Sequence, residues 1–220
     1  MAVAVVTGAN RGIGLELARQ LRARGDQVIA VCRRASPELA ALDVRVEAGI
    51  DFAEPGAAAA LQARLEHDRI DLLIQNAGIL RADGLDDLTP ENVRAQFEVN
   101  ALAPLLLTRA LLPRLAPGAK VALVTSRMGS MGDNGSGAYY GYRMSKAALN
   151  AAGVSLARDL TPRGIAVVIL HPGAVRTEMT HGHGMIEATE SAAGLLARID
   201  ETTLDSSGRF LHMNGEVLPW

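Results

Sequence analysis

The chain has 220 residues, 49% of them apolar, which is enough for one domain with a full hydrophobic core. This composition excludes an intrinsically disordered chain. The 22 basic and 24 acidic residues give a net charge of −2 and are spread along the chain, which argues against a protein that binds nucleic acid through a basic surface.

The first third of the chain alternates between strand-like and helix-like segments. Residues 2–7 are a continuous apolar run, typical of a strand buried on both faces. Residues 13–24 then carry apolar side chains at helical spacing, and Gly25 follows as a stop signal. The next segments are predicted to be two strands, a helix and a short strand, at residues 27–32, 44–50, 56–67 and 71–75.

The same alternation continues to the end of the chain. A long helix is predicted over residues 91–115, interrupted by Pro104 and Pro113. Strands separated by helices predict an α/β fold, a doubly wound parallel sheet of six to seven strands with helices on both faces, formed by one domain over residues 1–220. The remaining predicted strands are 121–126, 165–170 and 208–211, and the remaining helices are 142–160 and 189–199.

The sequence shows no sign of export or membrane insertion. Cys32 is the only cysteine, so no internal disulfide can form, and we expect a reducing compartment, the cytoplasm. The chain starts directly on an apolar run without a basic segment, so no signal peptide is expected. The most apolar long stretch, residues 101–112, is broken by Pro104 and Arg109 and is too short to span a bilayer.

Residues 7–14, Thr-Gly-Ala-Asn-Arg-Gly-Ile-Gly, lie where the first strand ends and the first helix begins. Glycines permit a tight turn and let a pyrophosphate approach the backbone, and the free N–H groups of the helix N-terminus attract the anion. The strand–turn–helix setting favours a dinucleotide site over an ordinary tight turn in another α/β protein. Its candidate residues are Gly8, Asn10, Arg11, Gly12, Ile13 and Gly14.

The end of the second strand indicates which nicotinamide cofactor would bind. An acidic residue there would bind the ribose 2′-hydroxyl of NAD(H), but this chain has Cys32, Arg33 and Arg34 instead. Guanidinium groups bind a phosphate bidentately, so the sequence predicts NADP(H), with NAD(H) less favoured and Arg11 as a further contact. The alternative is that these arginines are solvated surface residues, Arg34 above all.

The segment from Tyr142 to Lys146 carries the strongest chemical signal. Side chains four residues apart share one face of a helix, and an ammonium beside a phenol lowers the phenol pKa from its ordinary value of about 10. All three tyrosines fall together at 139, 140 and 142, but only Tyr142 has a lysine four residues later. Only two of the 22 basic residues are lysines, which favours a chemical role over an incidental surface pair.

These motifs resemble those of the short-chain dehydrogenase/reductase family over residues 3–177. Residues 7–14 match its Thr-Gly-x-x-x-Gly-x-Gly turn at every fixed position, and residues 142–146 match its Tyr-x-x-x-Lys motif. The resemblance implies a Rossmann fold in which Tyr142 is the general acid for carbonyl reduction or the base for alcohol oxidation. Lys146 would lower the phenol pKa and hold the nicotinamide ribose, while the hydride transfer belongs to the cofactor.

The resemblance also implies a catalytic serine ahead of Tyr142. Residues 125–129, Thr-Ser-Arg-Met-Gly, fit the family's Ser-Ser-x-x-Gly pattern and make Ser126 the residue whose hydroxyl binds the substrate oxygen. Ser126 precedes Tyr142 by 16 residues, a longer gap than is usual in the family, and the glycine-rich segment 133–141 can hold the extra residues as a loop. Ser130 is the alternative serine.

Other stretches match positions that surround the cofactor in the family. Asn100 matches an asparagine that supports a proton-relay water, the alternative being a polar group bonded to its own helix backbone. Asp51 matches an aspartate that contacts the adenine, or it caps the next helix. Gln75 replaces the first asparagine of the family's Asn-Asn-Ala-Gly. The candidate contacts here are Asp51, Phe52, Asn76, Ala77 and Gly78.

Residues 171–177 follow the sixth predicted strand and match the family's Pro-Gly-x-x-x-Thr. Ligands bind at the carboxyl ends of parallel strands, and the resemblance implies that this segment contacts the nicotinamide. His171 is expected to be structural. Residues 181–183, His-Gly-His, lack further ligands, so no metal is expected, and they fall in a substrate loop at about 174–190. The candidate contacts are Pro172, Gly173, Val175 and Thr177.

Together these features predict an NADP(H)-dependent oxidoreductase that interconverts a small-molecule carbonyl and an alcohol. Residues 126–146 and 207–220 are similar to a subgroup of C-signal-like proteins and sniffer-type carbonyl reductases. The alternative is therefore a cofactor-binding signalling or regulatory protein with little turnover. The resemblance also implies a homodimer or homotetramer that pairs through the helices at 91–115 and 142–160, with no nucleic-acid or membrane partner.

Overall fold

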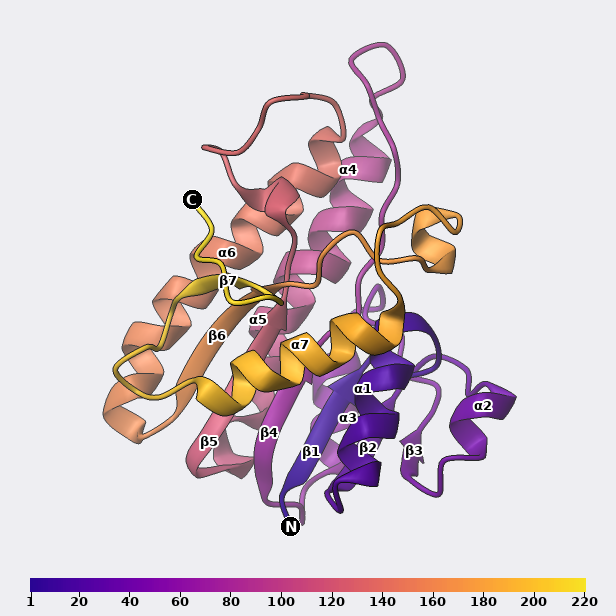
Figure 1. The fold of residues 1–220 in the computed structure, drawn as a ribbon. Coiled ribbons are helices and arrows are strands. Elements are labelled where there is room, and N and C mark those ends of the chain that lie inside the picture. The colour runs from indigo at the N-terminus through magenta and orange to yellow at the C-terminus, as the bar shows by residue number, and fades with distance from the viewer.

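Seven parallel strands form the central sheet of the computed structural model, which describes all 220 residues (Figure 1). Their order is β3-β2-β1-β4-β5-β6-β7, and every neighbouring pair is parallel. The predicted doubly wound α/β fold is therefore confirmed. The strands are β1 (Val3–Thr7), β2 (Gln27–Val31), β3 (Arg45–Glu47), β4 (Ile70–Gln75), β5 (Leu115–Val124), β6 (Ala166–His171) and β7 (Phe210–His212).

Helices cover both faces of this sheet (Figure 1). One face carries α1 and α7, the other carries α3, α4, α5 and α6, and the short α2 lies beyond the β3 edge. None of these helices is both long enough and apolar enough to cross a membrane. Their bounds are α1 (Gly12–Ala23), α2 (Pro37–Ala40), α3 (Ala57–Arg64), α4 (Pro90–Phe97), α5 (Ala103–Leu111), α6 (Tyr140–Leu160) and α7 (Ala188–Glu201).

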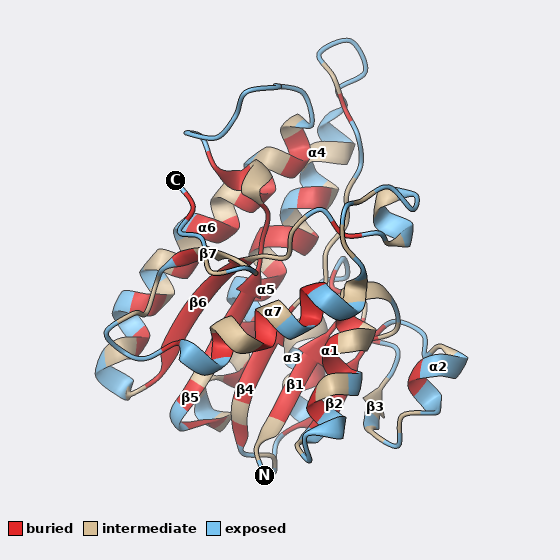
Figure 2. Ribbon diagram, viewed as in Figure 1, coloured by how far each residue is buried: buried red, intermediate tan, exposed pale blue.

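Two hydrophobic cores, one on each face, hold the helices to the sheet. Successive strand residues point to opposite faces, so Val5 belongs to one core and Val6 to the other. Figure 2 shows the result: buried strands, with helices exposed on their outer sides. Each buried leucine stabilises the fold by about 1.5–3 kcal/mol. The fully buried leucines of the helices are Leu17, Leu21, Leu39 and Leu195 in one core and Leu61, Leu107 and Leu111 in the other.

The long predicted helix over 91–115 differs from the observed structure at its middle and its end. The helical path changes to a π-helical turn at Glu98–Leu102 before α5, so Pro104 does not interrupt it. Proline lacks an N–H and its ring crowds the carbonyl four residues earlier, and the wider π turn leaves room for it. A 3₁₀ turn at Leu112–Arg114 ends the path, and Leu115 already belongs to β5.

Two other elements also differ from the prediction. β3 covers only Arg45–Glu47, because the edge strand pairs with β2 over those three residues alone. The short helix α2 was not predicted, although its signals are in the sequence. The Ser36 hydroxyl accepts the N–H of Leu39 at 3.1 Å, and Pro37 occupies the first turn, both typical of a helix start.

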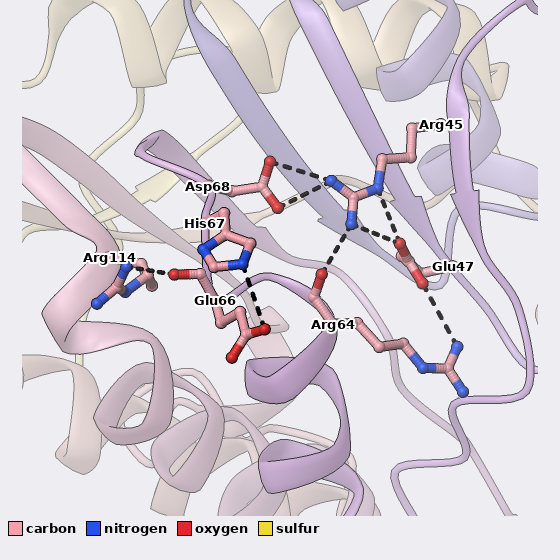
Figure 3. Close-up of polar contacts among 7 residues, drawn as sticks. All are labelled: Arg45, Glu47, Arg64, Glu66, His67, Asp68 and Arg114. Atoms are coloured by element: carbon pink, nitrogen blue, oxygen red, sulfur yellow. Dashed lines mark hydrogen bonds and ion pairs between the residues drawn. The ribbon is translucent and has the colours of Figure 1, made fainter.

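An ion-pair cluster holds the β3 edge to the turn before β4 (Figure 3). Arg45 binds both carboxylate oxygens of Asp68 at 2.8 and 3.0 Å and one oxygen of Glu47 at 2.8 Å. Arg64 at the end of α3 lies 3.4 Å from Glu47 and accepts a hydrogen bond from Arg45 on its carbonyl. Partly exposed ion pairs contribute at most about 1 kcal/mol each to stability. The main effect of the cluster is therefore local: it holds the edge strand β3 in place.

Gly153, in the middle of α6, marks a close approach of this helix to the sheet. A Cβ here would lie 2.7 Å from Cγ1 and Cδ1 of Ile169 and 3.0 Å from Cδ1 of Leu123, both fully buried. Despite alanine's better helix propensity, we expect Gly153→Ala to lower the free energy of unfolding by about 1–2 kcal/mol in urea titrations. Gly135→Ala, with open space around the added Cβ, is the control. Equal stability of Gly153→Ala and wild type would contradict the close contact.

The order of the strands creates a crevice beside β1. The chain adds β2 and β3 on one side of β1 and then crosses to place β4 on the other side. In parallel sheets such a switch point leaves a ligand crevice at the carboxyl ends of the two central strands. The turns that follow β1 and β4 both lie at this edge, so the fold brings the two predicted cofactor motifs together.

Candidate active site

The glycine-rich turn bends sharply between β1 and α1. Gly8 and Gly12 have φ values of 66° and 53°, a left-handed conformation that favours glycine. A Cβ on Gly14 would overlap the carbonyl oxygen of Gly8. α1 begins with no side-chain cap and no acidic residue in its first turn, so its N–H groups are open to an anion. The turn fits a dinucleotide phosphate.

A cavity of about 470 Å³ lies over this turn and between the ends of β1, β2 and β4. Most of the predicted cofactor contacts line it: Gly8, Asn10, Arg11, Gly12, Ile13, Gly14, Arg33, Asp51, Phe52, Asn76, Ala77, Gly78 and Thr177. The sequence analysis did not select the others as contacts: Cys32, Ile50, Ala53, Ile79, Arg81, Ala95, Val99, Arg176, Glu178 and Met179. Several of these residues flank a predicted contact in the sequence. Ala95 and Val99 are one helical turn apart, and this spacing could have indicated that both face the cavity.

The three candidate arginines differ in position. Arg11 and Arg33 line the cavity, whereas Arg34 is exposed and lies outside it, as its alternative role of surface residue predicts. Arg11 is ion-paired with Glu178, and Arg33 lies 3.8 Å from Asp51. These pairs are solvent-exposed and therefore weak, so both guanidinium groups can exchange a carboxylate for a phosphate.

Asp51 lies at the cavity wall and closes its own turn. Its Oδ1 accepts the N–H of Ala53 at 3.0 Å. The helix that follows is preceded by Gly56 as its N-cap, so the alternative that Asp51 caps this helix is wrong. Phe52 beside it is 9% exposed and belongs to the core as well as to the cavity.

The turn after β4 is hydrogen-bonded to the turn after β1. Asn76 donates to the Thr7 carbonyl at 3.0 Å, and the Thr7 hydroxyl accepts the N–H of Asn76 at 3.0 Å. Gln75, which replaces an asparagine of the family pattern, is buried and donates to the Pro104 carbonyl at 2.9 Å. The longer glutamine side chain therefore ties β4 to α5 and does not reach the cavity.

Helix α6 begins just before the predicted catalytic pair and buries both side chains. Tyr142 is 8% exposed and Lys146 is 4% exposed. The Lys146 ammonium lies 5.7 Å from the centre of the Tyr142 ring and donates to the Val124 carbonyl at 3.0 Å. Neither side chain lines the cavity, but a Cβ on the cavity residue Gly78 would lie 3.6 Å from the Lys146 Nζ. The pair therefore lies next to the cavity.

Burial decides the protonation of this pair. It raises the pKa of Tyr142 to about 12, with the Ser126 hydroxyl opposing the rise, and lowers the pKa of Lys146 to about 8. The pKa of Tyr142 is thus raised, contrary to the predicted lowering by the Lys146 ammonium, because desolvation is its largest cause. At neutral pH the phenol keeps its proton, as a general acid must.

The lowered pKa of Lys146 has a measurable effect on stability. Between pH 8 and 10 the folded chain has released a proton that the unfolded chain, with the ordinary lysine pKa of 10.5, still holds. The free energy of unfolding therefore rises with pH over this window, by about 2 kcal/mol. In urea titrations the free energy of unfolding should show this rise in wild type and not in Lys146→Met, because all other groups titrate in both proteins. Parallel pH profiles of the two proteins would contradict it.

Of the two candidate serines, Ser126 affects the pKa of Tyr142, and which of them binds the substrate oxygen stays a prediction. The Ser126 hydroxyl accepts the N–H of Met128 at 3.1 Å and influences the pKa of Tyr142. The Ser130 hydroxyl is buried and accepts the N–H of Asp133 at 3.1 Å, so it closes the following turn. Between Ser126 and Tyr142 the chain forms a 3₁₀ turn, which was not predicted, and the exposed loop that the sequence predicted.

Asn100 lies fully buried in the π-helical turn and binds the loop after β4. Its Oδ1 accepts the N–H of Ile79 at 2.8 Å, and its Nδ2 donates to the Ile79 carbonyl at 2.9 Å and to the Ser145 hydroxyl at 3.0 Å. The alternative that it bonds to its own helix is therefore wrong. It connects the cavity wall to the residue beside Lys146, and the water relay stays a prediction.

The rim segment after β6 is only partly in contact with the cavity. Thr177 lines it, and a Cβ on Gly12 would lie 3.3 Å from the Thr177 Cγ2. Pro172, Gly173 and Val175 lie outside the cavity, and the Val175 carbonyl accepts the hydroxyl of Thr180 at 2.9 Å. Their contact with a nicotinamide therefore stays a prediction.

One histidine at the rim, His171, is uncharged. Burial, with the charges of His212, Arg127 and Lys146 next, lowers the pKa of His171 to about 3, so this ring is neutral at physiological pH. Its ring packs edge-on against His212 with the centroids 4.9 Å apart, in line with the expected structural role. No three His, Cys, Asp or Glu side chains lie together in an arrangement that could hold a metal ion.

Asn150 is a site residue that the sequence analysis missed. Its Oδ1 accepts the Thr125 hydroxyl at 2.7 Å, and its Nδ2 donates to the Gly129 carbonyl at 3.4 Å. Both contacts hold α6 against the segment that carries Ser126. The sequence did contain a pattern that could have identified Asn150. Tyr142, Lys146 and Asn150 follow each other at intervals of four residues and therefore share one helix face.

Comparison with known proteins shows which family the chain resembles. The family model described as short chain dehydrogenase matches residues 2–186. The 1-hydroxy-2-glutathionyl-2-methyl-3-butene dehydrogenase of Rhodococcus sp. (strain AD45) is 42% identical over the whole of both chains. The C-signal protein of Myxococcus xanthus is 45% identical over 69% of this chain and 93% of its own. The NADPH-bound carbonyl reductase from chicken fatty liver is 32% identical and superposes with a TM-score of 0.88 over 100% of this chain and 98% of that one.

The chain belongs to the short-chain dehydrogenase family and is an oxidoreductase of that family. The predicted resemblance to C-signal-like proteins and carbonyl reductases is confirmed.

Proposed function

We propose that this chain is an NADP(H)-dependent oxidoreductase that interconverts a carbonyl and an alcohol, with Tyr142 as its general acid and base. The observation that carries the proposal is the buried pair of Tyr142 and Lys146 beside the glycine-lined cavity. The Rhodococcus relative is named a dehydrogenase, and the chicken carbonyl reductase binds NADPH, which supports both the reaction and the cofactor.

The residues of the cavity fit a dinucleotide phosphate. The turn from Gly8 to Gly14 and the open N-terminus of α1 would hold the diphosphate. Arg11 and Arg33 would hold the 2′-phosphate, and Asp51 and Phe52 would contact the adenine. The bound cofactor supplies the hydride for reduction or accepts it in oxidation.

The chain's own residues handle the proton. The Tyr142 phenol, protonated at neutral pH, would donate its proton to the substrate oxygen as that oxygen becomes a hydroxyl. The Ser126 hydroxyl would hydrogen-bond the same oxygen and stabilise the charge that develops on it. The Lys146 ammonium would stabilise the phenolate that remains, and in alcohol oxidation the phenolate would take the proton back.

The test is consumption of NADPH by the purified protein with a panel of aldehydes and ketones, followed by absorbance. We expect turnover of at least one small-molecule carbonyl, with NADPH preferred over NADH. The similarity to C-signal favours a second candidate, a protein that binds cofactor for a signalling role. Tight NADPH binding without reduction of any panel compound would favour that candidate and contradict the enzymatic proposal.

We also propose that two or four copies assemble through the helical face formed by α4, α5 and α6. Several apolar side chains on this face are exposed, with Phe97 at 42%, Leu105 at 38% and Met144 at 53%. Exposed apolar side chains gathered on neighbouring helices are typical of protein interfaces. Sedimentation equilibrium measures the assembly, and a mass of 23.1 kDa, that of one chain, would contradict it.

A further inference from the structure

Asp83 is a buried carboxylate in a loop whose other residues are exposed or half-buried. The loop runs between β4 and α4, and Asp83 is 4% exposed while its neighbours Arg81, Ala82 and Leu85 are exposed. In Figure 2 a short buried segment interrupts the loop beside α4. Burying a carboxylate is costly unless a donor or a positive charge meets it, so its partners indicate what the loop does.

The partners of Asp83 are the first residues of α6. Its Oδ2 accepts the N–H of Gly141 at 3.1 Å, and its backbone carbonyl accepts the N–H of Tyr139 at 2.7 Å. Tyr139 is the N-cap residue of α6, has a φ of 54° and makes no side-chain cap. A side chain from another part of the chain therefore performs the capping that the helix lacks, and its charge faces the positive end of the helix dipole.

The contact depends on a glycine at position 141. A Cβ there would lie 2.5 Å from Gln96 Nε2, 3.0 Å from Asp83 Oδ2 and 3.2 Å from the Cα of Val93. Gln96 is fully buried in α4, and its Oε1 accepts the N–H of Arg81 at 2.9 Å. Loop, α4 and the start of α6 therefore meet at one point with no free space.

Tyr142 follows Gly141 directly. We infer that Asp83 is a positioning residue: it caps α6 from the loop after β4 and so fixes the Tyr142 phenol relative to the cavity. The inference rests on the proposed function, in which this phenol transfers a proton. A displacement of about 1 Å at a reacting group can lower the rate up to about a hundredfold, so the cap matters to the reaction although it does not touch the substrate.

Three variants of the full chain separate capping from general stability. Asp83→Ala removes the acceptor, and we expect kcat to fall about tenfold while the Kd for NADPH and the substrate KM stay within about threefold. Asp83→Asn keeps an acceptor for the Gly141 N–H, and we expect it to restore kcat to within about threefold of wild type. Asp86→Ala changes an exposed aspartate of the same loop and is the matched control.

Two results would overturn the inference: a kcat of Asp83→Ala within twofold of wild type, or an Asp83→Asn variant as slow as Asp83→Ala. Should Asp83→Ala not fold, amide hydrogen exchange of the wild type decides. N–H groups of a first helical turn ordinarily exchange fast, whereas a Gly141 N–H bonded to Asp83 should be protected. Fast exchange there would overturn the inference too. If instead Tyr142→Phe kept full activity, the proposed function would fail, whatever the Asp83 variants showed.

Discussion

Replacing Tyr142 by phenylalanine should abolish most carbonyl reduction while leaving the protein folded and able to bind cofactor. The substitution removes only the hydroxyl, and the ring keeps its buried packing in α6. A positioned general acid contributes about 10²–10⁴-fold to the rate, so we expect kcat/KM to fall about a thousandfold. The Kd for NADPH, measured by fluorescence, should stay within about threefold of wild type.

Tyr140→Phe is the matched control for this experiment. Tyr140 lies on the same helix two positions earlier, is partly exposed and has Met144, not a lysine, four residues later. This control should keep kcat/KM within about twofold of wild type. Activity of Tyr142→Phe within tenfold of wild type would show that another group donates the proton. It would contradict the assignment of Tyr142 as the general acid.

Replacing Arg11 and Arg33 together by alanine should weaken the binding of NADPH about a hundredfold and leave NADH binding nearly unchanged. Hydrogen bonds to charged groups contribute about 1.5–3 kcal/mol each, and about 1.4 kcal/mol is a tenfold change in Kd, so each arginine accounts for at least about tenfold. Both side chains line the cavity and now pair with exposed carboxylates, which a phosphate can displace. Only NADPH carries the 2′-phosphate, so only its Kd should respond.

Arg34→Ala is the matched control for the arginine pair. Arg34 is the next residue in the chain, equally charged, but outside the cavity. Its replacement should change the Kd for NADPH less than twofold. If the double variant lost NADPH and NADH affinity equally, the arginines would support the fold of the cavity and would not bind the 2′-phosphate.

The parts of this protein that short motifs encode were predictable from the sequence. The glycine turn, the arginines after β2 and the Tyr142–Lys146 spacing each depend on a few neighbouring residues, and the structure places them around or beside one cavity. Most of the sheet was also predictable, because most strands are apolar runs and the longer helices carry their own period, whereas β3 is Arg-Val-Glu. Such features are local in the chain, so no knowledge of distant contacts was needed.

Features that depend on contacts between distant segments were decided by the tertiary structure alone. The pKa of Tyr142 is raised and not lowered, because the strength of desolvation depends on how completely the fold buries the phenol. Asn100 and Asp83 bind backbone groups 21 and 58 residues away, and their partners cannot be read from their own neighbours. Spacing along the chain thus identifies which chemical groups are present, while packing between segments sets their charge and position.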